Sequence, residues 1–286
     1  MKKKKILILG SEGQIGTHLV DYLKSKKRFK IIKFDLILGK KFDLRNFNNN
    51  LLKKYIQQSD FVFFLAFDVG GSRYLKKYQR SYSFLINNIL IMGNVFKLLK
   101  ESKKKFLFAS SQMSNMDFSP YGTLKRLGED ITKSINGVYV KFWNVYGIEK
   151  QLDKSHVITD FILMALEKKK IDMLTNGKET REFLYADDCS AGLLKIMNKF
   201  DYFKKIKKEL HLTTAKKTKV IDIAKIVKKI LKKKNIDVRI NRALSKDDVQ
   251  KNKSNEANKF LFNFWKPNYT IESGIEKTLK YYMKFR

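Results

Sequence analysis

A glycine-rich turn near the start of the chain constrains the fold more than any other feature. Gly10, Gly13 and Gly16 follow one another at intervals of three residues. They come directly after an apolar run at 4–9 and open a segment, 14–27, whose apolar residues recur at helical spacing. A strand, a glycine turn and a helix in this order bind the diphosphate of a dinucleotide, because glycines let the backbone approach the phosphates. The sequence therefore predicts a dinucleotide-binding domain, with a purely structural turn as the alternative.

Strands and helices alternate along the first half of the chain. Strands are expected at 4–9, 29–34, 61–65, 105–109 and 138–142, and helices at 14–27, 82–100 and 121–134. Strands that alternate with helices of this length form right-handed crossovers between parallel strands. The predicted fold class is therefore α/β, a Rossmann-type doubly wound parallel sheet.

The order is less regular beyond residue 145. Helices are expected at 156–166, 187–198, 220–232 and 272–282, and short strands at 182–185 and 210–213. We interpret this half as a smaller C-terminal α/β substrate lobe, made of residues 146–184 and 213–286. The NAD-binding Rossmann domain then comprises residues 1–145, with 185–212 returning to it.

The composition favours a globular protein in a reducing compartment. The chain has 286 residues, of which 43% are hydrophobic, enough to bury a sizeable core. Its uninterrupted apolar runs, such as 61–67, are far shorter than the ~20 residues of a membrane helix. A single cysteine, Cys189, allows no intrachain disulfide and no cysteine-based zinc site. We expect a cytoplasmic protein that has no export signal, binds no metal and does not enter a membrane.

The net charge of +33 raises the question of a nucleic-acid partner. The excess is mostly lysine scattered along helices, whereas phosphate and base recognition usually recruits the bidentate arginine side chain. We therefore interpret the charge as a compositional bias of a lysine-rich proteome and expect no nucleic acid. Steering of an anionic substrate is a second interpretation.

An acidic residue marks the end of the second expected strand. Asp35 lies nineteen residues after Gly16, where a carboxylate accepts hydrogen bonds from the adenosine ribose and repels a 2′-phosphate. This placement favours NAD over NADP. The cofactor residues expected in this region are Gly10, Gly13, Gln14, Ile15, Gly16 and Asp35.

Tyr121 and Lys125 are four residues apart in an expected helix, so both project from one face. An ammonium close to a phenol favours the phenolate and lowers the pKa of the tyrosine. Such a phenolate can accept a proton from a hydroxyl group while hydride leaves the same carbon. A tyrosine and a lysine at this spacing also occur by chance on helix surfaces, and the pair gains weight only from its position after the glycine turn and a strand ending in Ser110 and Ser111.

These features, in this order, resemble the extended branch of the short-chain dehydrogenase/reductase superfamily, the nucleotide-sugar epimerases and dehydratases. The spacing of the glycines, "KFDL" at 41–44, "DFVFFLAFDVGG" at 60–71, "FASSQMS" and "NNILIMGN" carry the resemblance. It implies that Ser111 holds the substrate oxygen, beside Tyr121 as base and Lys125. It also implies that NAD contacts Asp43, Leu44, Leu65, Ala66, Phe67, Asn88, Ser110, Tyr121, Lys125, Phe142, Asn144 and Val145.

Further segments resemble the substrate-binding parts of the family. "KFWNVYG" at 141–147 and "TNGKETREFLYADD" at 175–188 imply that Asn144 and Arg181 contact a diphosphate, although Lys141 replaces the usual arginine. "FLAFDVGGSRYL" is similar to GDP-mannose-type enzymes, and more narrowly to GDP-heptose 4-dehydrogenases of bacterial capsule synthesis. The implied substrate residues are Gly70, Gly71, Ser72, Arg73, Ser111, Gln112, Asn144, His156, Val157 and Arg181. His18 and His211 are expected to be structural.

The resemblance also limits the reaction. Gln112 and Met113 stand where the family's 4,6-dehydratases carry acidic residues. Its 3,5-epimerases need a cysteine or an equivalent acid/base group near this strand, and Met113 and Ser114 supply none. The chemistry that remains is oxidation of one sugar hydroxyl, at C4, which either yields a ketone or, in a 4-epimerase, is followed by reduction from the other face. A catalytically idle NAD-binding scaffold is a further alternative.

Comparison with the family also bears on how the site is covered and on whether the protein forms a dimer. Only nine residues separate Ser111 from Tyr121, so the site is either more open than in the family or covered by another segment. The helices at 82–101 and 121–135 resemble those that pair in the family's homodimers, so we expect a homodimer.

Overall fold

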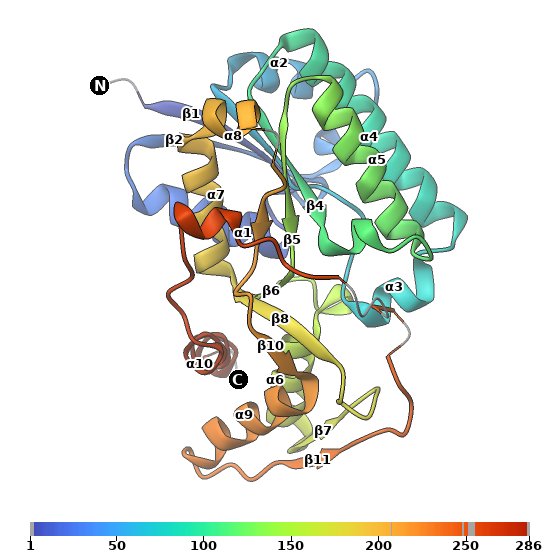
Figure 1. The fold of residues 1–286 in the computed structure, drawn as a ribbon, viewed down its shortest axis with the longest axis vertical. Helices are drawn as coiled ribbons and strands as arrows, with labels where there is room; N and C mark the ends of the chain where they lie inside the picture. The colour runs from blue at the N-terminus through green and yellow to red at the C-terminus, as the bar shows by residue number, and fades with distance from the viewer. Residues whose placement is uncertain (1–2, 207, 248, 251–254, 285–286) are drawn as a thin grey trace.

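A six-stranded sheet, in which all neighbouring strands are parallel, forms the larger part of the molecule in the computed structural model (Figure 1). The structure describes residues 3–206, 208–247, 249–250 and 255–284. The order of the strands is β2-β1-β3-β4-β5-β9. Their bounds are β1 (Lys4–Leu9), β2 (Phe29–Phe34), β3 (Phe61–Phe64), β4 (Phe106–Ser111), β5 (Val138–Phe142) and β9 (His211–Leu212). This architecture confirms the predicted α/β fold class.

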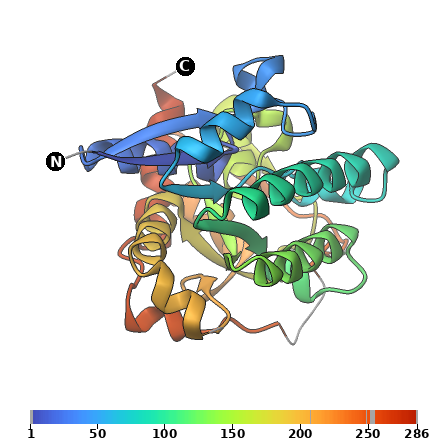
Figure 2. The same cartoon turned by 90° about the horizontal axis from the view of Figure 1, so that it is seen from above.

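Helices cover both faces of this sheet (Figure 2). They are α1 (Gln14–Ser25), α2 (Asn50–Gln58), α4 (Tyr82–Ser102), α5 (Pro120–Ser134), α7 (Ala186–Asn198) and α8 (Phe200–Ile206), whereas α3 (Ser72–Tyr78) lies beyond the carboxyl ends of the strands. Alternate strand residues point to opposite faces, and both faces are apolar. In β1, Ile6 and Ile8 join the core under α1 and α7, whereas Leu7 and Leu9 join the core under α2 and α4. A strand buried on both sides explains the continuous apolar runs in the sequence.

Two small sheets and three further helices form the other part of the molecule (Figure 1). One sheet has the order β10-β8-β6, and β11 pairs with β7. The bounds are β6 (Asn144–Tyr146), β7 (Lys170–Asp172), β8 (Thr180–Tyr185), β10 (Lys217–Lys219), β11 (Arg239–Asn241), α6 (Val157–Lys168), α9 (Val220–Lys232) and α10 (Ile271–Met283). These elements enclose a third core, which includes Ile162, Val227 and Leu279.

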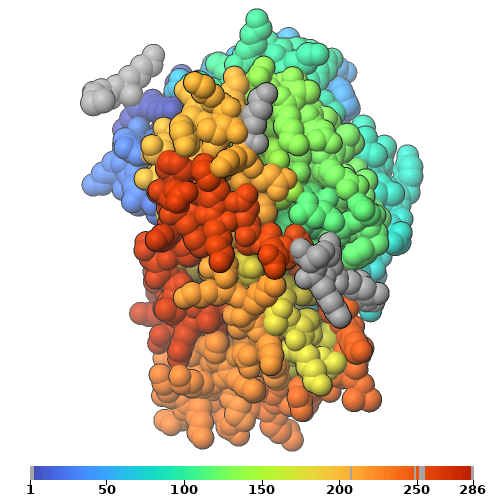
Figure 3. All heavy atoms as spheres, viewed as in Figure 1, coloured from blue at the N-terminus to red at the C-terminus, as the bar shows by residue number. Residues whose placement is uncertain are grey.

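The chain returns to the large sheet after β8. β9 pairs with β5 through Lys141 and His211, and α7 packs against α1. The 3₁₀ helix η5 (Phe260–Asn263) brings Leu261, with the nearby Trp265, into the core under α1 and α7. In Figure 3 this late segment, coloured red, lies against the orange segment of α8 and β9. Residues distant in the sequence therefore complete the first core.

The longer predicted elements are confirmed, with shifts of a few residues at their ends, as are the short strands β8 and β9, whereas several other short elements were not predicted. Among these are α2, α3, α8 and the short strands β6, β7, β10 and β11, together with the 3₁₀ helices η1 (Leu36–Leu38), η2 (Lys40–Phe42), η3 (Gln112–Asn115) and η4 (Leu152–Lys154). α2 starts at a side-chain cap, in which Asn49 accepts a hydrogen bond from the backbone of Leu52. Strands of three residues carry too little periodicity to be recognised.

The helix α4 is long and apolar enough, by length and composition alone, to cross a membrane. In the structure its inner face packs on the sheet through side chains such as Phe84 and Val95. It also buries Asn94, whose amide donates to the carbonyls of Leu44 and Asn46. The apolar character of α4 therefore has a local explanation in the core.

Candidate active site

A cavity of about 580 Å³ opens at the carboxyl ends of the parallel strands. The glycine turn lies at one end of its lining, and residues of η4 and α6 lie at the other. Loops that follow parallel strands all emerge at the same edge of the sheet, which is where α/β proteins bind their ligands. The loops that follow β1, β2, β3, β4 and β5 therefore all line this one cavity.

The glycine turn has two positions that admit no side chain. Gly10 has φ of 86°, and an added Cβ would lie 2.7 Å from the backbone nitrogen of Ala66. A Cβ on Gly16 would lie 1.9 Å from the carbonyl oxygen of Gly10. At Gly13 the nearest atom is 3.6 Å away, so the protein itself leaves room there. The space above Gly13 therefore suits a ligand that approaches the backbone.

Polar groups around the turn fit NAD. Asp35 accepts hydrogen bonds from the backbone nitrogens of Glu12 (2.9 Å) and Ile37 (3.1 Å), which hold its carboxylate at the cavity wall. Gln14 also lines the cavity, and the Nε2 atom of its side chain is buried without a hydrogen-bond partner. A buried donor without a partner is costly, and a phosphate oxygen would satisfy it. Asp35, Gln14 and Gly13 would thus hold the ribose and diphosphate of the cofactor.

The predicted catalytic residues meet in this cavity. Tyr121 and Lys125 occupy the first two turns of α5, whose N-terminus is capped by Ser119. Ser111 is the last residue of β4, and Tyr121, Lys125 and Ser111 all line the cavity. The ammonium of Lys125 donates to the carbonyl of Ala109 at 2.7 Å and lies 3.7 Å from the centre of the Phe67 ring.

Burial governs the ionisation of this pair. It raises the pKa of Tyr121 to about 12, although a hydrogen bond with Ser111 acts in the opposite direction. It lowers the pKa of Lys125 to about 7. Lys125 is not among the groups that shift the pKa of Tyr121 in this structure, and the lowering of that pKa by Lys125 stays a prediction.

Most predicted site residues line the cavity. Those of the cofactor set that do so are Gly10, Gly13, Gln14, Ile15, Gly16, Asp35, Asp43, Leu44, Leu65, Ala66, Phe67, Ser110, Tyr121, Lys125, Phe142, Asn144 and Val145. Those of the substrate set are Gly70, Gly71, Ser72, Ser111, Gln112, Asn144, His156 and Val157. Residues from the whole length of the first domain and from α6 therefore line one cavity.

Three predicted residues are not among those that line it. Asn88 is fully buried under the loop after β3, where its amide group binds the backbone nitrogen and oxygen of Asp68. Arg73 pairs with Asp160 at 3.1 Å. Arg181 forms a largely buried ion pair with Asp247. Each of these side chains is engaged with the protein, so the structure does not bring them to the ligand space.

Several residues of the cavity wall were not predicted. Arg45 binds the carboxylate of Asp43 through Nε (2.9 Å) and Nη2 (2.7 Å) and donates to Asn87. Its position directly after the "KFDL" segment, two residues beyond Asp43, was the available signal. Asp68 accepts hydrogen bonds from the hydroxyl of Tyr74 (2.7 Å) and the ammonium of Lys154 (2.8 Å). No local sequence pattern predicts the contact with Lys154.

A charged pair lies at the far end of the cavity. Glu149 accepts from the backbone nitrogen of His156 at 2.9 Å, and its other oxygen is 2.6 Å from the Nδ1 atom of His156. Burial alone would lower the pKa of His156, but Glu149 reverses this and raises it. The pKa of Glu149 is lowered because the attraction of His156 outweighs burial. Two ammonium groups also line the cavity and are paired in turn, Lys154 with Asp68 and Lys150 with Glu12 of the glycine turn.

A late segment of the chain covers the short loop after Ser111. Gln112 donates to Gln250 at 3.2 Å, and Asn255 donates to the backbone oxygen of Gln112 at 2.8 Å. Gln250 itself lines the cavity and lies 3.5 Å from Asn144. The short loop was expected either to leave the site more open or to be covered by another segment, and the structure shows cover by another segment.

Comparison with known proteins assigns the family. The model of the NAD dependent epimerase/dehydratase family matches residues 6–209, more than half of the chain. The chain belongs to this family. Members of the NAD dependent epimerase/dehydratase family are NAD-dependent enzymes that act on nucleotide sugars, so the predictions of an enzyme and of NAD as its cofactor are confirmed at the level of the family.

Individual relatives of this family member are distant. The sequence is 22% identical over 316 residues to UDP-glucuronic acid decarboxylase 1 of Danio rerio, covering 99% of this chain and 73% of the relative. Its structure is similar to a GDP-6-OMe-4-keto-L-xylo-heptose reductase from C. jejuni, with a TM-score of 0.82, 19% identity and coverage of 100% and 99% of the two chains. It is also similar to UDP-N-acetylglucosamine 4-epimerase from Methanobrevibacter ruminantium M1, with a TM-score of 0.76, 22% identity and complete coverage of both chains. At these identities the structural likeness defines the fold.

Proposed function

We propose that this enzyme oxidises the C4 hydroxyl of a nucleotide-activated sugar with NAD as the acceptor. The observation that carries this proposal is that Ser111, Tyr121 and Lys125 line the same cavity as the glycine turn. A hydroxyl base and a hydride acceptor must reach the same carbon, and one continuous cavity allows this. An idle scaffold would have no use for these three residues together.

The side chains divide the chemical work. Bound NAD⁺ supplies a hydride acceptor and a positive charge. Tyr121, as the phenolate, takes the proton of the sugar hydroxyl, and Ser111 holds the hydroxyl oxygen by a hydrogen bond. Lys125 in its ammonium form stabilises the phenolate. Since burial disfavours both ionised forms in the free protein, Tyr121 becomes an effective base only when positive charge gathers around it.

The nucleotide diphosphate of the substrate is proposed to lie beside His156 and Asn144, which line the cavity together with Lys154. His156 and Lys154 would then exchange their pairing with Glu149 and Asp68 for pairing with the phosphates. This location replaces the expected contact with Arg181, which is paired with Asp247. A GDP-linked mannose- or heptose-type sugar is the favoured substrate, supported by the paired glycines 70 and 71 and by the fold's similarity to a GDP-linked heptose reductase. A place in bacterial capsule or lipopolysaccharide synthesis would follow from such a substrate.

A 4-epimerase is the second candidate. It needs the same residues and differs only in returning the hydride to the opposite face of C4. The structural likeness to a 4-epimerase from Methanobrevibacter ruminantium M1 favours it. No carboxylate side chain immediately follows Ser111, where Gln112 and Met113 lie, which disfavours elimination of water.

We further propose a homodimer formed through α4 and α5. Tyr82 and Ile89 of α4 and Leu127 of α5 expose 80%, 48% and 49% of their surfaces. Apolar side chains gathered on adjacent helices are typical of protein interfaces. The cytoplasm remains the proposed location, and residues 1–145 with 185–212 the proposed NAD-binding domain. β9 and α7, which pack on β5 and α1, support that division.

A panel of GDP-, UDP- and dTDP-linked sugars tests the proposal. Incubation with NAD should produce absorbance at about 340 nm if a keto sugar is released, and new sugar resonances in NMR spectra without net NADH if the enzyme is a 4-epimerase. A panel that yields neither signal, with a protein that binds NAD, would contradict both candidates.

A further inference from the structure

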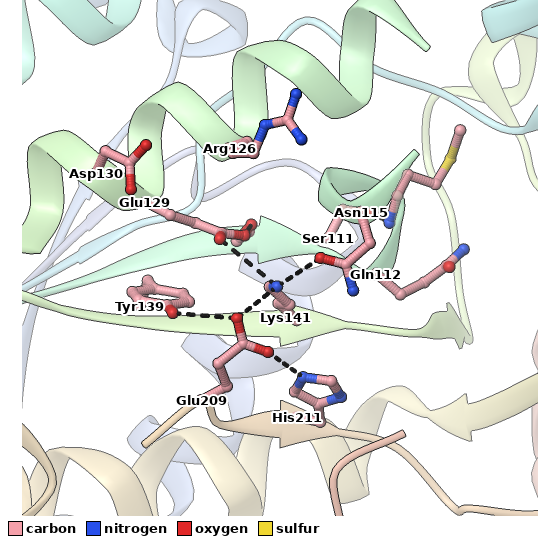
Figure 4. Close-up of polar contacts among 12 residues, drawn as sticks. Ser111, Gln112, Asn115, Arg126, Glu129, Asp130, Tyr139, Lys141, Glu209 and His211 are labelled. Carbon is pink, nitrogen blue, oxygen red and sulfur yellow. Dashed lines mark hydrogen bonds and ion pairs between the residues drawn. The ribbon is translucent and has the colours of Figure 1, made fainter. Parts of the chain in front are cut away.

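A buried cluster of charged residues lies behind the proposed active site and has no part in the chemistry described above. Glu129 of α5 and Lys141 of β5 are 3% and 2% exposed. The ammonium of Lys141 lies 3.6 Å from Glu129 and donates to Asn115 (2.9 Å) and Glu209 (2.8 Å) (Figure 4). Charged groups are buried at a large cost unless they are paired. Burial of these charges therefore calls for an explanation other than packing.

The cluster is connected to the proposed catalytic residues in two ways. The other carboxylate oxygen of Glu129 accepts a hydrogen bond from Ser110, which neighbours Ser111 and lines the cavity. In addition, Tyr121, Lys125 and Glu129 follow one another at intervals of four along α5 and so lie on one face of the helix. Glu129 is thus one turn beyond Lys125.

Lys125 needs a counter-charge that its immediate neighbours do not provide. Its ammonium is buried, and its described contacts are the neutral carbonyl of Ala109 and the faces of aromatic rings, chiefly Phe67. The negative charge of Glu129 acts on Lys125 and raises its pKa, against the larger effect of burial. Lys141 already has Glu209 as a partner, so Glu129 is not needed to neutralise it.

We propose that Glu129 is a positioning residue of the active site, which favours the ammonium form of Lys125 against the effect of burial and fixes the hydroxyl of Ser110. This inference rests on the proposed function, because the ammonium matters only if Lys125 supports a phenolate. Lys141, whose ammonium lies 3.6 Å from Glu129, is the ion-pair partner of that side chain. The cluster contains two ammonium groups and two carboxylates in all, so it is electrically balanced.

The groups that face Glu129 come from every neighbouring strand of this part of the sheet. They are Ser110 of β4, Lys141 and Tyr139 of β5, Glu209 before β9, and Lys125 and Asp130 of its own helix. Lys141 and His211 lower the pKa of Glu209 to about 2, so it stays ionised throughout the working range. Asp130 is exposed and shielded by water. Removing the charge of Glu129 should therefore act mainly on Lys125 and Lys141.

Direct titration of Lys125 tests the proposal without any substrate. The ¹³Cε signal of Lys125 in uniformly lysine-labelled protein, assigned by its absence in Lys125→Met, gives the midpoint of its ionisation. In Glu129→Gln this midpoint should fall by at least ~1 pH unit, because a buried ammonium loses its counter-charge. Asp130→Asn, which neutralises the adjacent exposed carboxylate, should leave the midpoint unchanged. A folded Glu129→Gln protein with the wild-type midpoint would overturn the proposal.

A second variant and a second readout separate the possible failures. Glu129→Gln combined with Lys141→Met leaves no unpaired charge from this pair and should show a smaller fall in the midpoint, because the repulsion between Lys141 and Lys125 is lost as well. This variant keeps the test open even if the single variant folds poorly. With an active substrate, the decline of kcat/KM at high pH should also move to lower pH by about 1 unit. Absence of turnover in the wild type would count against the proposed function, whereas an unchanged midpoint in both variants would count against the role of Glu129.

Discussion

Tyr121 and Lys125 show how little a residue's chemistry is decided by its neighbours in sequence. Their spacing predicts a shared helix face, and the structure confirms it. Their ionisation depends on the enclosing cavity, whose walls include Phe67 from another strand end. Burial raises the pKa of Tyr121 and lowers that of Lys125, so it disfavours the ionised form of both side chains.

Replacement of Tyr121 by Phe should abolish turnover and spare cofactor binding. The ring would remain, but no group would accept the hydroxyl proton, so kcat should fall by at least ~100-fold. Turnover of the active nucleotide sugar and quenching of protein fluorescence by NAD measure the two properties. Tyr202→Phe, at an exposed position, is the matched control. Retention of near-normal turnover by Tyr121→Phe would rule out its role as base.

The Glu149–His156 pair should stabilise the fold only within a window of pH. The pKa of His156 is raised on folding, so its contribution is complete below about 6.5 and is lost as the pH rises through the folded value. The pKa of Glu149 is lowered, so its contribution is complete above about 4.5 and is lost as the pH falls through the folded value.

The destabilisation caused by Glu149→Gln should therefore be largest between about pH 4.5 and 6.5 and should decline outside this range. Urea unfolding of the variant and the wild type across pH 3–9 measures it. Glu276→Gln, at an exposed position, should show no such maximum. A pH-independent difference for Glu149→Gln would show that the ion pair does not act in this way.

The strand–turn–helix unit of β1 and α1 is the element that the sequence defines best. Its bounds and its glycines follow from local rules, because a tight turn and a close helix restrict backbone and Cβ alike. The structure separates the roles of the glycines: Gly16 is required by the protein's own backbone, whereas Gly13 faces the cavity.

Alanine at Gly16 should therefore lower stability, whereas alanine at Gly13 should weaken the binding of NAD. Gly16→Ala places a Cβ against the carbonyl of Gly10 and should lower the free energy of unfolding by about 3 kcal/mol or more. Gly13 has φ of −68°, which alanine adopts freely, so Gly13→Ala should fold normally but bind NAD at least ~10-fold more weakly. Thermal unfolding and NAD titration distinguish the two. Equal loss of stability in both variants would contradict this separation.

The whole molecule depends on segments that return to the first sheet late in the chain. Leu261 and Trp265 complete the core under α1 and α7, and Gln250 reaches the cavity beside Asn144. Exposed apolar residues of α4 and α5 form the surface through which we propose that the chain dimerises.

Charge placed on that surface should dissolve the proposed dimer. Ile89→Lys combined with Leu127→Lys would bury two ammonium groups in an interface and should convert a dimer into a monomer. Sedimentation velocity measures the change. Leu244→Lys, at a fully exposed position far from both helices in the sequence, is the control and should stay dimeric. A wild-type monomer at micromolar concentration would contradict the proposal.

The sequence by itself determined the alternation of strands and helices, the glycine turn and the spacing of Tyr121 and Lys125, because these depend on local backbone geometry and on periodic burial. The tertiary structure decided which polar groups face the ligand space. It took Arg181, Arg73 and Asn88 out of the cavity lining by pairing them with other groups, and it brought Arg45, Glu149 and Gln250 into it. It also placed Glu129, Lys141 and Glu209 together behind Ser110. Such contacts join residues far apart in the chain, and their strength depends on burial, which only the packed molecule defines.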